Sequence, residues 1–121
     1  MATIVHFDIS ADDPKRAKDF YEKLFGWDIR QLSGPMDYFM VGTADLQNKP
    51  GIGGGISRRD ANSPAGIINY IGVSSIDETL EQVSEAGGTI ITGKQDVPGY
   101  GQLAICTDTE GNVFGVFQEK P

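Results

Sequence analysis

The chain has 121 residues, a formal net charge of −7 and one cysteine, with 39% hydrophobic and 22% charged residues. This size and composition are typical of one globular domain and argue against a disordered chain. The negative net charge argues against a nucleic-acid partner. The apolar runs are too short for a helix that spans a membrane.

The first residues contain neither a basic region nor an apolar signal core, so we expect a cytoplasmic protein. The single cysteine, Cys106, cannot form an internal disulfide and fits a reducing compartment. It lies inside the strand-like segment 103–107, and we interpret it as a small apolar strand residue. A catalytic thiol would need a base beside it.

The first half of the chain predicts one strand, one helix and three further strands. Residues 4–9 are rich in strand-forming residues. Asp13 and Pro14 then form a helix start, and Gly26 is the stop. Apolar residues at helical spacing predict that Phe20 and Tyr21 anchor this helix to the sheet. The further strands are predicted at residues 27–32, 38–42 and 51–56.

The second half predicts the same order of elements. Residues 67–73 form a strand candidate, Ser75 and Glu78 form a capping-box pattern, and Gly87 and Gly88 end the helix. The two predicted caps, Asp13 and Ser75, are 62 positions apart. The further strands are predicted at residues 89–92, 102–107 and 113–118.

We therefore predict a single domain over residues 1–121, built from a module at about residues 1–60 and another at about 65–121. Neither module alone buries much core, so the two should pack together or exchange with a second chain. Because edge strands would otherwise stay open, we expect a homodimer.

Three segments carry a resemblance to a known family: residues 5–9 (VHFDI), 19–27 (DFYEKLFGW) and 108–118 (DTEGNVFGVFQ). In this order and at these distances they resemble the vicinal oxygen chelate superfamily, which includes glyoxalases, bleomycin resistance proteins and extradiol dioxygenases. The resemblance covers nearly the whole chain and matches the order of elements read above. It implies an α+β fold in which two βαβββ modules form a curved, open mixed sheet, with the helices on its convex side.

The resemblance also implies a divalent metal on the concave side, held by His and Glu side chains from both modules. His6 occupies the ligand position on the first strand and is the only histidine of the chain. The aligned positions in the second module are Gly72 and Gly115, which have no side chain to donate, and segment 51–56 offers no ligand. One of four positions remains, so we expect no native metal and no cofactor. A divalent metal on His6 is the alternative.

Asp8 lies two residues from His6, so strand alternation places both on one face. We predict that His6 is a polar pocket residue, hydrogen-bonded to Asp8 or to a ligand. We assign any catalytic role to His6 and Asp8, as a base with an orienting carboxylate. The same alternation gives the predicted ligand pocket as His6, Asp8, Tyr70, Gly72, Ser74, Val113, Gly115 and Phe117.

Glycine at 72 and 115 predicts free space in this pocket, because two bulky ligands are missing. One or more of Trp27, Tyr38 and Phe39 is expected to face the same space. The alternative for Tyr70, Val113 and Phe117 is that they fill the core between the modules.

Three functions stay open at this point. We favour a small-molecule-binding protein without the usual metal site, because of the acidic charge, the aromatic residues and the missing metal ligands. The resemblance to the drug-sequestering members of the superfamily implies a cationic, aromatic ligand. The second is an enzyme: a metal-dependent glyoxalase-like lyase or isomerase, or a dioxygenase, on His6, or an acid–base catalyst using His6 and Asp8 alone. The third is a non-catalytic dimeric regulatory or structural subunit.

Overall fold

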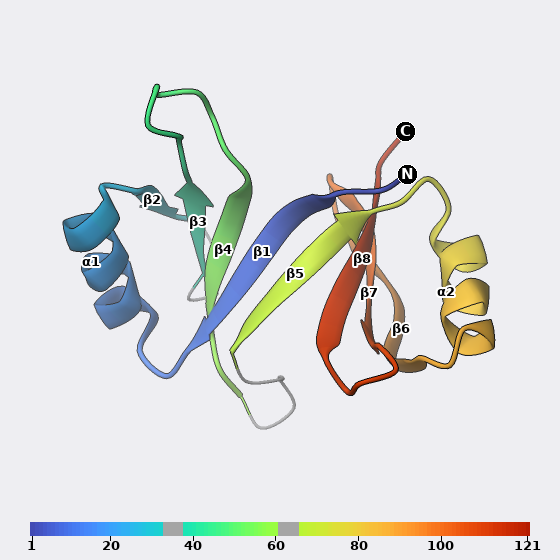
Figure 1. Ribbon diagram of the computed structural model, residues 1–121. Helices are drawn as coiled ribbons and strands as arrows, with labels where there is room; N and C mark the ends of the chain where they lie inside the picture. Colours follow the sequence, from blue (N-terminus) through green and yellow to red (C-terminus); the bar gives the residue numbers. More distant parts are fainter. Residues whose placement is uncertain (33–37, 61–65) are drawn as a thin grey trace. The chain divides into compact units, whose positions relative to one another are not determined.

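The computed structural model describes residues 1–32, 38–60 and 66–121. The chain divides into two compact units: a first unit, His6–Ile67, and a second unit, Met1–Val5 with Ile68–Pro121. Each unit contains one helix and an open, mixed sheet (Figure 1). The α+β class and the order of elements predicted from the sequence are confirmed.

Strand β1 (Ile4–Ala11), which belongs to the first unit from His6 on, leads into helix α1 (Pro14–Phe25). Asp13 caps the helix, since its carboxylate accepts a hydrogen bond from the backbone N–H of Arg16 at 3.1 Å. Gly26 ends it in the left-handed conformation, with φ of 68°, which favours glycine. Both ends of the helix are therefore where the sequence predicted them.

Three further strands complete the first sheet, in the order β2-β3-β4-β1. Strands β1 and β4 are parallel, and the other neighbours are antiparallel. The three strands are β2 (Asp28–Gln31), β3 (Tyr38–Gly42) and β4 (Gly53–Arg58). Strand β4 begins at Gly53, two residues later than predicted, because Gly51 and Pro50 still belong to the connection from β3.

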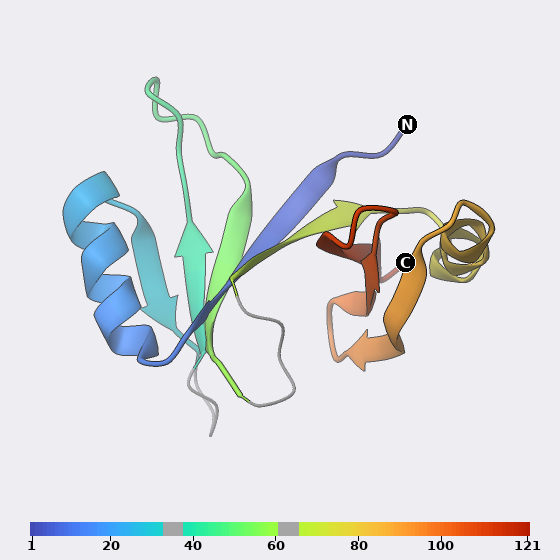
Figure 2. The same ribbon diagram turned by 60° about the horizontal axis from the view of Figure 1, so that its bottom comes forward.

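Helix α1 lies against one face of the first sheet, as both ribbon views show (Figures 1 and 2). The core of this unit lies between the helix and the sheet. Tyr21 of the helix stacks on Trp27, with ring centroids 5.0 Å apart, so it anchors the helix as predicted. Phe20 is 56% exposed, and its predicted anchoring role is wrong. The buried core residues are Ile9, Ala11, Ile29, Phe39, Val41 and Ile56.

The second unit repeats the pattern with strand order β5-β8-β7-β6. Strands β5 and β8 are parallel, whereas β8, β7 and β6 form an antiparallel meander. Its elements are β5 (Ile67–Gly72), α2 (Ile76–Glu85), β6 (Thr89–Val97), β7 (Gly101–Thr107) and β8 (Val113–Glu119). Strand β6 runs five residues beyond its predicted end, with register shifts that let it continue past Thr92.

Helix α2 covers one face of the second sheet, where Ile76, Ala104 and Val116 are buried. Two side chains cap its N-terminus. The hydroxyl of Ser75 accepts from the N–H of Glu78 at 3.2 Å, as the capping pattern predicted. The amide oxygen of Gln118 accepts from the N–H of Ile76 at 2.8 Å, which no local pattern indicated, because Gln118 lies 42 residues away in sequence.

Among the described residues, no helix is long and apolar enough to cross a membrane.

Candidate functional site

The sheet face of the first unit that lies opposite α1 carries the polar pair predicted from the sequence. The imidazole Nε2 of His6 lies 3.1 Å from Oδ1 of Asp8. Both side chains are partly accessible, 33% for His6 and 26% for Asp8. Their neighbours Phe7 and Ile9 point to the other face and pack in the core, as strand alternation requires. The predicted hydrogen bond between His6 and Asp8 is confirmed.

Tyr38 adds a third group to this pair. Its hydroxyl donates a hydrogen bond to the same carboxylate oxygen, Oδ1 of Asp8, at 3.2 Å. Because Asp8 is on β1 and Tyr38 on β3, the tyrosine reaches across β4, where Gly55 pairs with Asp8. A Cβ at Gly55 would collide with the Tyr38 hydroxyl and would lie 2.8 Å from Oδ1 of Asp8. Glycine is therefore the residue that lets the three side chains meet.

The sequence predicted that one or more of three first-half aromatics would share the face of His6. Tyr38 does so. Phe39 is buried in the core beside α1, and Trp27 packs against that core and stacks on Tyr21. The three differ because Tyr38 and Phe39 alternate along β3, whereas Trp27 precedes β2 and meets the helix.

In the second unit, Tyr70 covers Gly115 on the sheet face opposite α2. The two residues are direct neighbours on the parallel strands β5 and β8. A Cβ at Gly115 would collide with the Tyr70 ring, which is itself only 5% exposed. At Gly72, a Cβ would lie 2.9 Å from Cγ1 of Val5. The free space predicted at these two glycines is therefore wrong, because neighbouring side chains fill it.

The other predicted pocket residues of the second unit fall into two groups. Val113 and Phe117 share the face of Gly115 and are partly buried, with Leu103 and Ile105 of β7 beside them. Ser74 does not share that face by alternation, since β5 ends at Gly72 and Ser74 is exposed in the bend before α2. Leu103 and Ile105 were not predicted, because the sheet face on which they lie depends on the register between β7 and β8.

The residues present do not fit the metal centre that the resemblance implies. His6 is the only histidine. The described residues contain no group of three or more His, Cys, Asp or Glu side chains that could hold a metal ion. A carboxylate could not simply be added at Gly115, because the Tyr70 ring occupies the position of its Cβ.

Cys106 is a core residue. It is fully buried on β7, and burial raises the pKa of its thiol. Reactive cysteines have a lowered pKa and an accessible sulfur. The interpretation of Cys106 as an apolar strand residue is confirmed.

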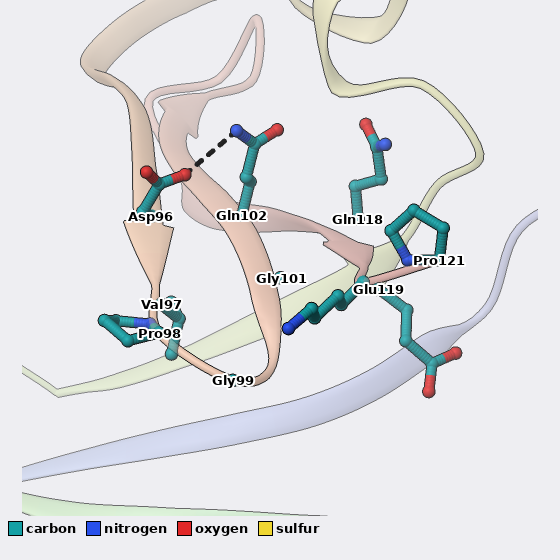
Figure 3. Close-up of a pocket in the computed structure, with 10 residues that line it drawn as sticks. Asp96, Val97, Pro98, Gly99, Gly101, Gln102, Gln118, Glu119 and Pro121 are labelled. Atoms are coloured by element: carbon teal, nitrogen blue, oxygen red, sulfur yellow. Dashed lines mark hydrogen bonds between the residues drawn. The ribbon is translucent and has the colours of Figure 1, made fainter.

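A surface hollow of about 550 Å³ lies at the tip of the β6–β7 hairpin and the end of β8. Figure 3 shows Asp96 and Gln102 on its wall, joined by a hydrogen bond of 3.0 Å. The hollow contains none of the predicted site residues. Its lining residues are Asp96, Val97, Pro98, Gly99, Gly101, Gln102, Gln118, Glu119, Lys120 and Pro121.

Comparison with known proteins gives a match over residues 3–116 to the Glyoxalase/Bleomycin resistance protein/Dioxygenase superfamily. The chain is 25% identical over 121 residues to CFP32 of Mycobacterium tuberculosis, whose name gives a provisional assignment as a glyoxylase. It is 25% identical over 128 residues to the anthracycline biosynthesis protein DauV of a Streptomyces species. These alignments cover 98% and 93% of this chain but only 45% and 46% of the relatives. The chain thus spans about half the length of the curated relatives it matches.

Solved structures share the fold at low sequence identity. The hypothetical protein BH1468 of Bacillus halodurans has a TM-score of 0.71 at 18% identity, with 99% of this chain and 96% of that chain covered. A methylmalonyl-CoA epimerase, solved with methylmalonyl-CoA and NH4+, has a TM-score of 0.71 at 13% identity, with 100% and 99% covered. At these identities the likeness shows the fold alone.

Proposed function

We propose a small-molecule-binding function for this chain, which belongs to the glyoxalase/bleomycin resistance protein/dioxygenase superfamily by its match over residues 3–116. In this proposal the polar sheet face of the first unit holds the polar end of the ligand, through His6 and Asp8. The protein works without the usual metal.

The observation that carries the proposal is the cluster of His6, Asp8 and Tyr38. Polar side chains on a sheet face that the unit's own helix does not cover have no role in the core of that unit. They stay partly accessible while being hydrogen-bonded to one another. A small number of fixed polar groups that orient the ligand is typical of small-molecule sites.

The comparisons suggest which compounds to test first. A methylmalonyl-CoA epimerase with the same fold was solved with a CoA thioester bound, and another relative is named for anthracycline biosynthesis. CoA thioesters and polycyclic aromatic compounds are therefore sensible first probes.

Acid–base catalysis by His6 and Asp8 is the second candidate function. The 3.1 Å contact between Nε2 and Oδ1 is the geometry of a base with its orienting carboxylate. In this reading His6 moves a proton on a bound ligand, and Asp8 holds the imidazole in place. The proposed binding function would then be the first step of a reaction.

A binding screen of the purified chain tests the proposal. A library of CoA thioesters and polycyclic aromatic compounds is screened by ligand-observed NMR against wild type, His6→Ala and Asp96→Asn. We expect hits that His6→Ala weakens by about ten-fold, the effect of losing one charge-assisted or two neutral hydrogen bonds. Asp96→Asn, in the hairpin hollow, should bind as wild type does.

The other outcomes separate the alternatives. Binding lost in Asp96→Asn but kept in His6→Ala would move the site to the hollow. Turnover of a hit, abolished in His6→Ala, would favour the enzyme. No binding at all would contradict the proposal and favour a regulatory or structural subunit. The homodimer stays a prediction, which light scattering on the purified chain tests.

A further inference from the structure

Two donors converge on one oxygen at the polar face of the first unit. The His6 Nε2 lies 3.1 Å from Oδ1 of Asp8, and the Tyr38 hydroxyl lies 3.2 Å from the same atom. The three residues come from two strands, β1 and β3, with β4 between them. This arrangement is more specific than the pair of His6 and Asp8 that the sequence predicted.

A carboxylate oxygen only accepts hydrogen bonds, so both partners of Oδ1 must donate. The imidazole nitrogen that faces Asp8, Nε2, must therefore carry a proton. The Tyr38 hydroxyl donates to the same oxygen and thereby limits the rotation of the carboxylate. A carboxylate held by two donors keeps the imidazole in one orientation and in one tautomer, as orienting carboxylates do in other sites.

We propose that Tyr38 is a positioning residue: through Asp8 it fixes His6 as the Nε2-protonated tautomer, and it leaves Oδ2 of Asp8 to accept a hydrogen bond from a donor group of the ligand. Among the described residues no partner of Oδ2 is present, and the Asp8 side chain is 26% exposed. The choice of ligand donor rests on the proposed function. The role of Tyr38 does not.

A glycine on the neighbouring strand β4 leaves room for the contact between Tyr38 and Asp8. Gly55 lies beneath its hydroxyl, and any Cβ there would displace the hydroxyl and press on Oδ1 of Asp8. The next glycine on the same face, Gly53, has only a backbone oxygen near its Cβ position, at 3.4 Å, so the close approach is specific to Gly55. A tyrosine that merely filled space would not require its hydroxyl to meet the carboxylate over a glycine.

Because His6 is the only histidine, its tautomer can be read without assignment. The experiment is a long-range ¹H–¹⁵N correlation spectrum of the full chain labelled with ¹⁵N-histidine. It is recorded without ligand, at a pH high enough for the imidazole to be in its neutral form. We expect the Nε2–H pattern in wild type. In Tyr38→Phe, which removes only the hydroxyl, the share of the Nδ1–H form should rise about three-fold, as expected for the loss of one neutral hydrogen bond.

Tyr100→Phe is the matched control, because Tyr100 is 56% exposed on the hairpin tip of the second unit. Its spectrum should equal that of wild type. If Tyr38→Phe does not fold, Gly55→Ala displaces the same hydroxyl by another route and should give the same rise. A wild-type spectrum of the Nδ1–H form, or spectra of folded Tyr38→Phe and Gly55→Ala that match wild type, would overturn the assignment.

The ligand screen and the tautomer measurement fail independently. If Tyr38 positions His6 but no library compound binds, the proposed function is contradicted and the role of Tyr38 stands. If compounds bind through His6 while the tautomer does not respond to Tyr38→Phe, the binding function stands and the positioning role is wrong.

Discussion

Each unit has one helix and four strands in the same order. The sheet face that the helix does not cover is polar in the first unit and mostly apolar in the second. The first unit presents His6, Asp8 and Tyr38, joined by hydrogen bonds. The second unit presents Tyr70 over Gly115, with partly buried apolar side chains around them. A repeated fold thus need not repeat a site, because chemistry follows the side chains and not the plan of strands.

The registers show where the two faces diverge. Asp8 pairs with Gly55 on parallel strands in the first unit, and Tyr70 pairs with Gly115 in the same way in the second. Each of these glycines lies under a tyrosine ring. In the second unit the paired residue itself supplies the ring. In the first unit the ring comes from Tyr38 on a third strand, which leaves the paired position to a carboxylate.

The two glycines that lie under tyrosine rings should be the most sensitive to substitution. Gly115→Ala should lower the free energy of unfolding by about 2–3 kcal/mol, since the buried Tyr70 ring must move within a packed core. Gly55→Ala should cost about 1 kcal/mol less, because Tyr38 is only partly buried and can turn toward solvent. Urea unfolding of both variants measures the difference.

Gly93→Ala is the control for this comparison, because nothing lies within 4 Å of its Cβ position on the exposed strand β6. It should change stability by less than about 0.5 kcal/mol. Equal costs at 55 and 115 would mean that the two rings are equally constrained, and the contrast between the faces would be lost.

The helix caps give the next effect. Gln118→Ala should cost about 1–2 kcal/mol, because it leaves the N–H of the buried Ile76 without its acceptor. Asp13→Ala removes an exposed cap and should cost about 1 kcal/mol or less. Thermal and urea unfolding of the two variants should rank Gln118→Ala as the more destabilising. The reverse order would show that water reaches the start of α2.

The smallest effect is the pH dependence of the turn at Asp108 in the second unit. Hydrogen bonds from the backbone N–H of Asn112, its side-chain amide and the N–H of Glu110 lower the pKa of Asp108 below its ordinary value of 3.8. A lowered folded-state pKa means that this carboxylate stabilises the fold above the unfolded-state pKa. The contribution is lost as pH falls through the folded-state pKa.

Asp108→Asn tests this effect. It keeps the Oδ1 acceptor of the two backbone N–H groups and removes the charge, and it replaces Oδ2, the acceptor of the Asn112 side-chain amide, with a donor. Wild type should be slightly more stable than the variant at neutral pH, and the difference should shrink as the pH falls below about 4. Urea midpoints measured between acidic and neutral pH give the comparison. A difference that grows on acidification would contradict the sign.

Local patterns were sufficient to predict most of the fold. Asp13, Gly26 and Ser75 act within one turn of helix, so their neighbours in sequence settle their roles. Alternation likewise predicted that His6 and Asp8 meet. Tyr38, Gln118 and the closed space over Gly115 depend on strands distant in sequence, and no single segment contains that register.

Two side chains were assigned to the wrong face because a neighbouring element ended sooner, or covered less, than the sequence pattern assumed. Ser74 was placed on the face of Gly72 by counting two residues further, but β5 has already ended. Phe20 was placed on the buried stripe of α1 by its spacing, but the sheet covers only the side that carries Ala17 and Tyr21. In both cases the residue period of the strand or helix was correct. The length of β5, or the part of α1 that the sheet covers, was overestimated.

We propose that a hydrogen-bonded polar face on His6 takes the place of the metal centre that the family resemblance implies. Elemental mass spectrometry of untagged protein prepared without chelators tests it most directly, followed by thermal shifts with Ni²⁺, Zn²⁺, Mn²⁺ and Fe²⁺ on wild type and His6→Ala. We expect far less than one metal ion per chain and no saturable stabilisation by any of these ions. Near-stoichiometric metal, or a saturable stabilisation that disappears in His6→Ala, would contradict it.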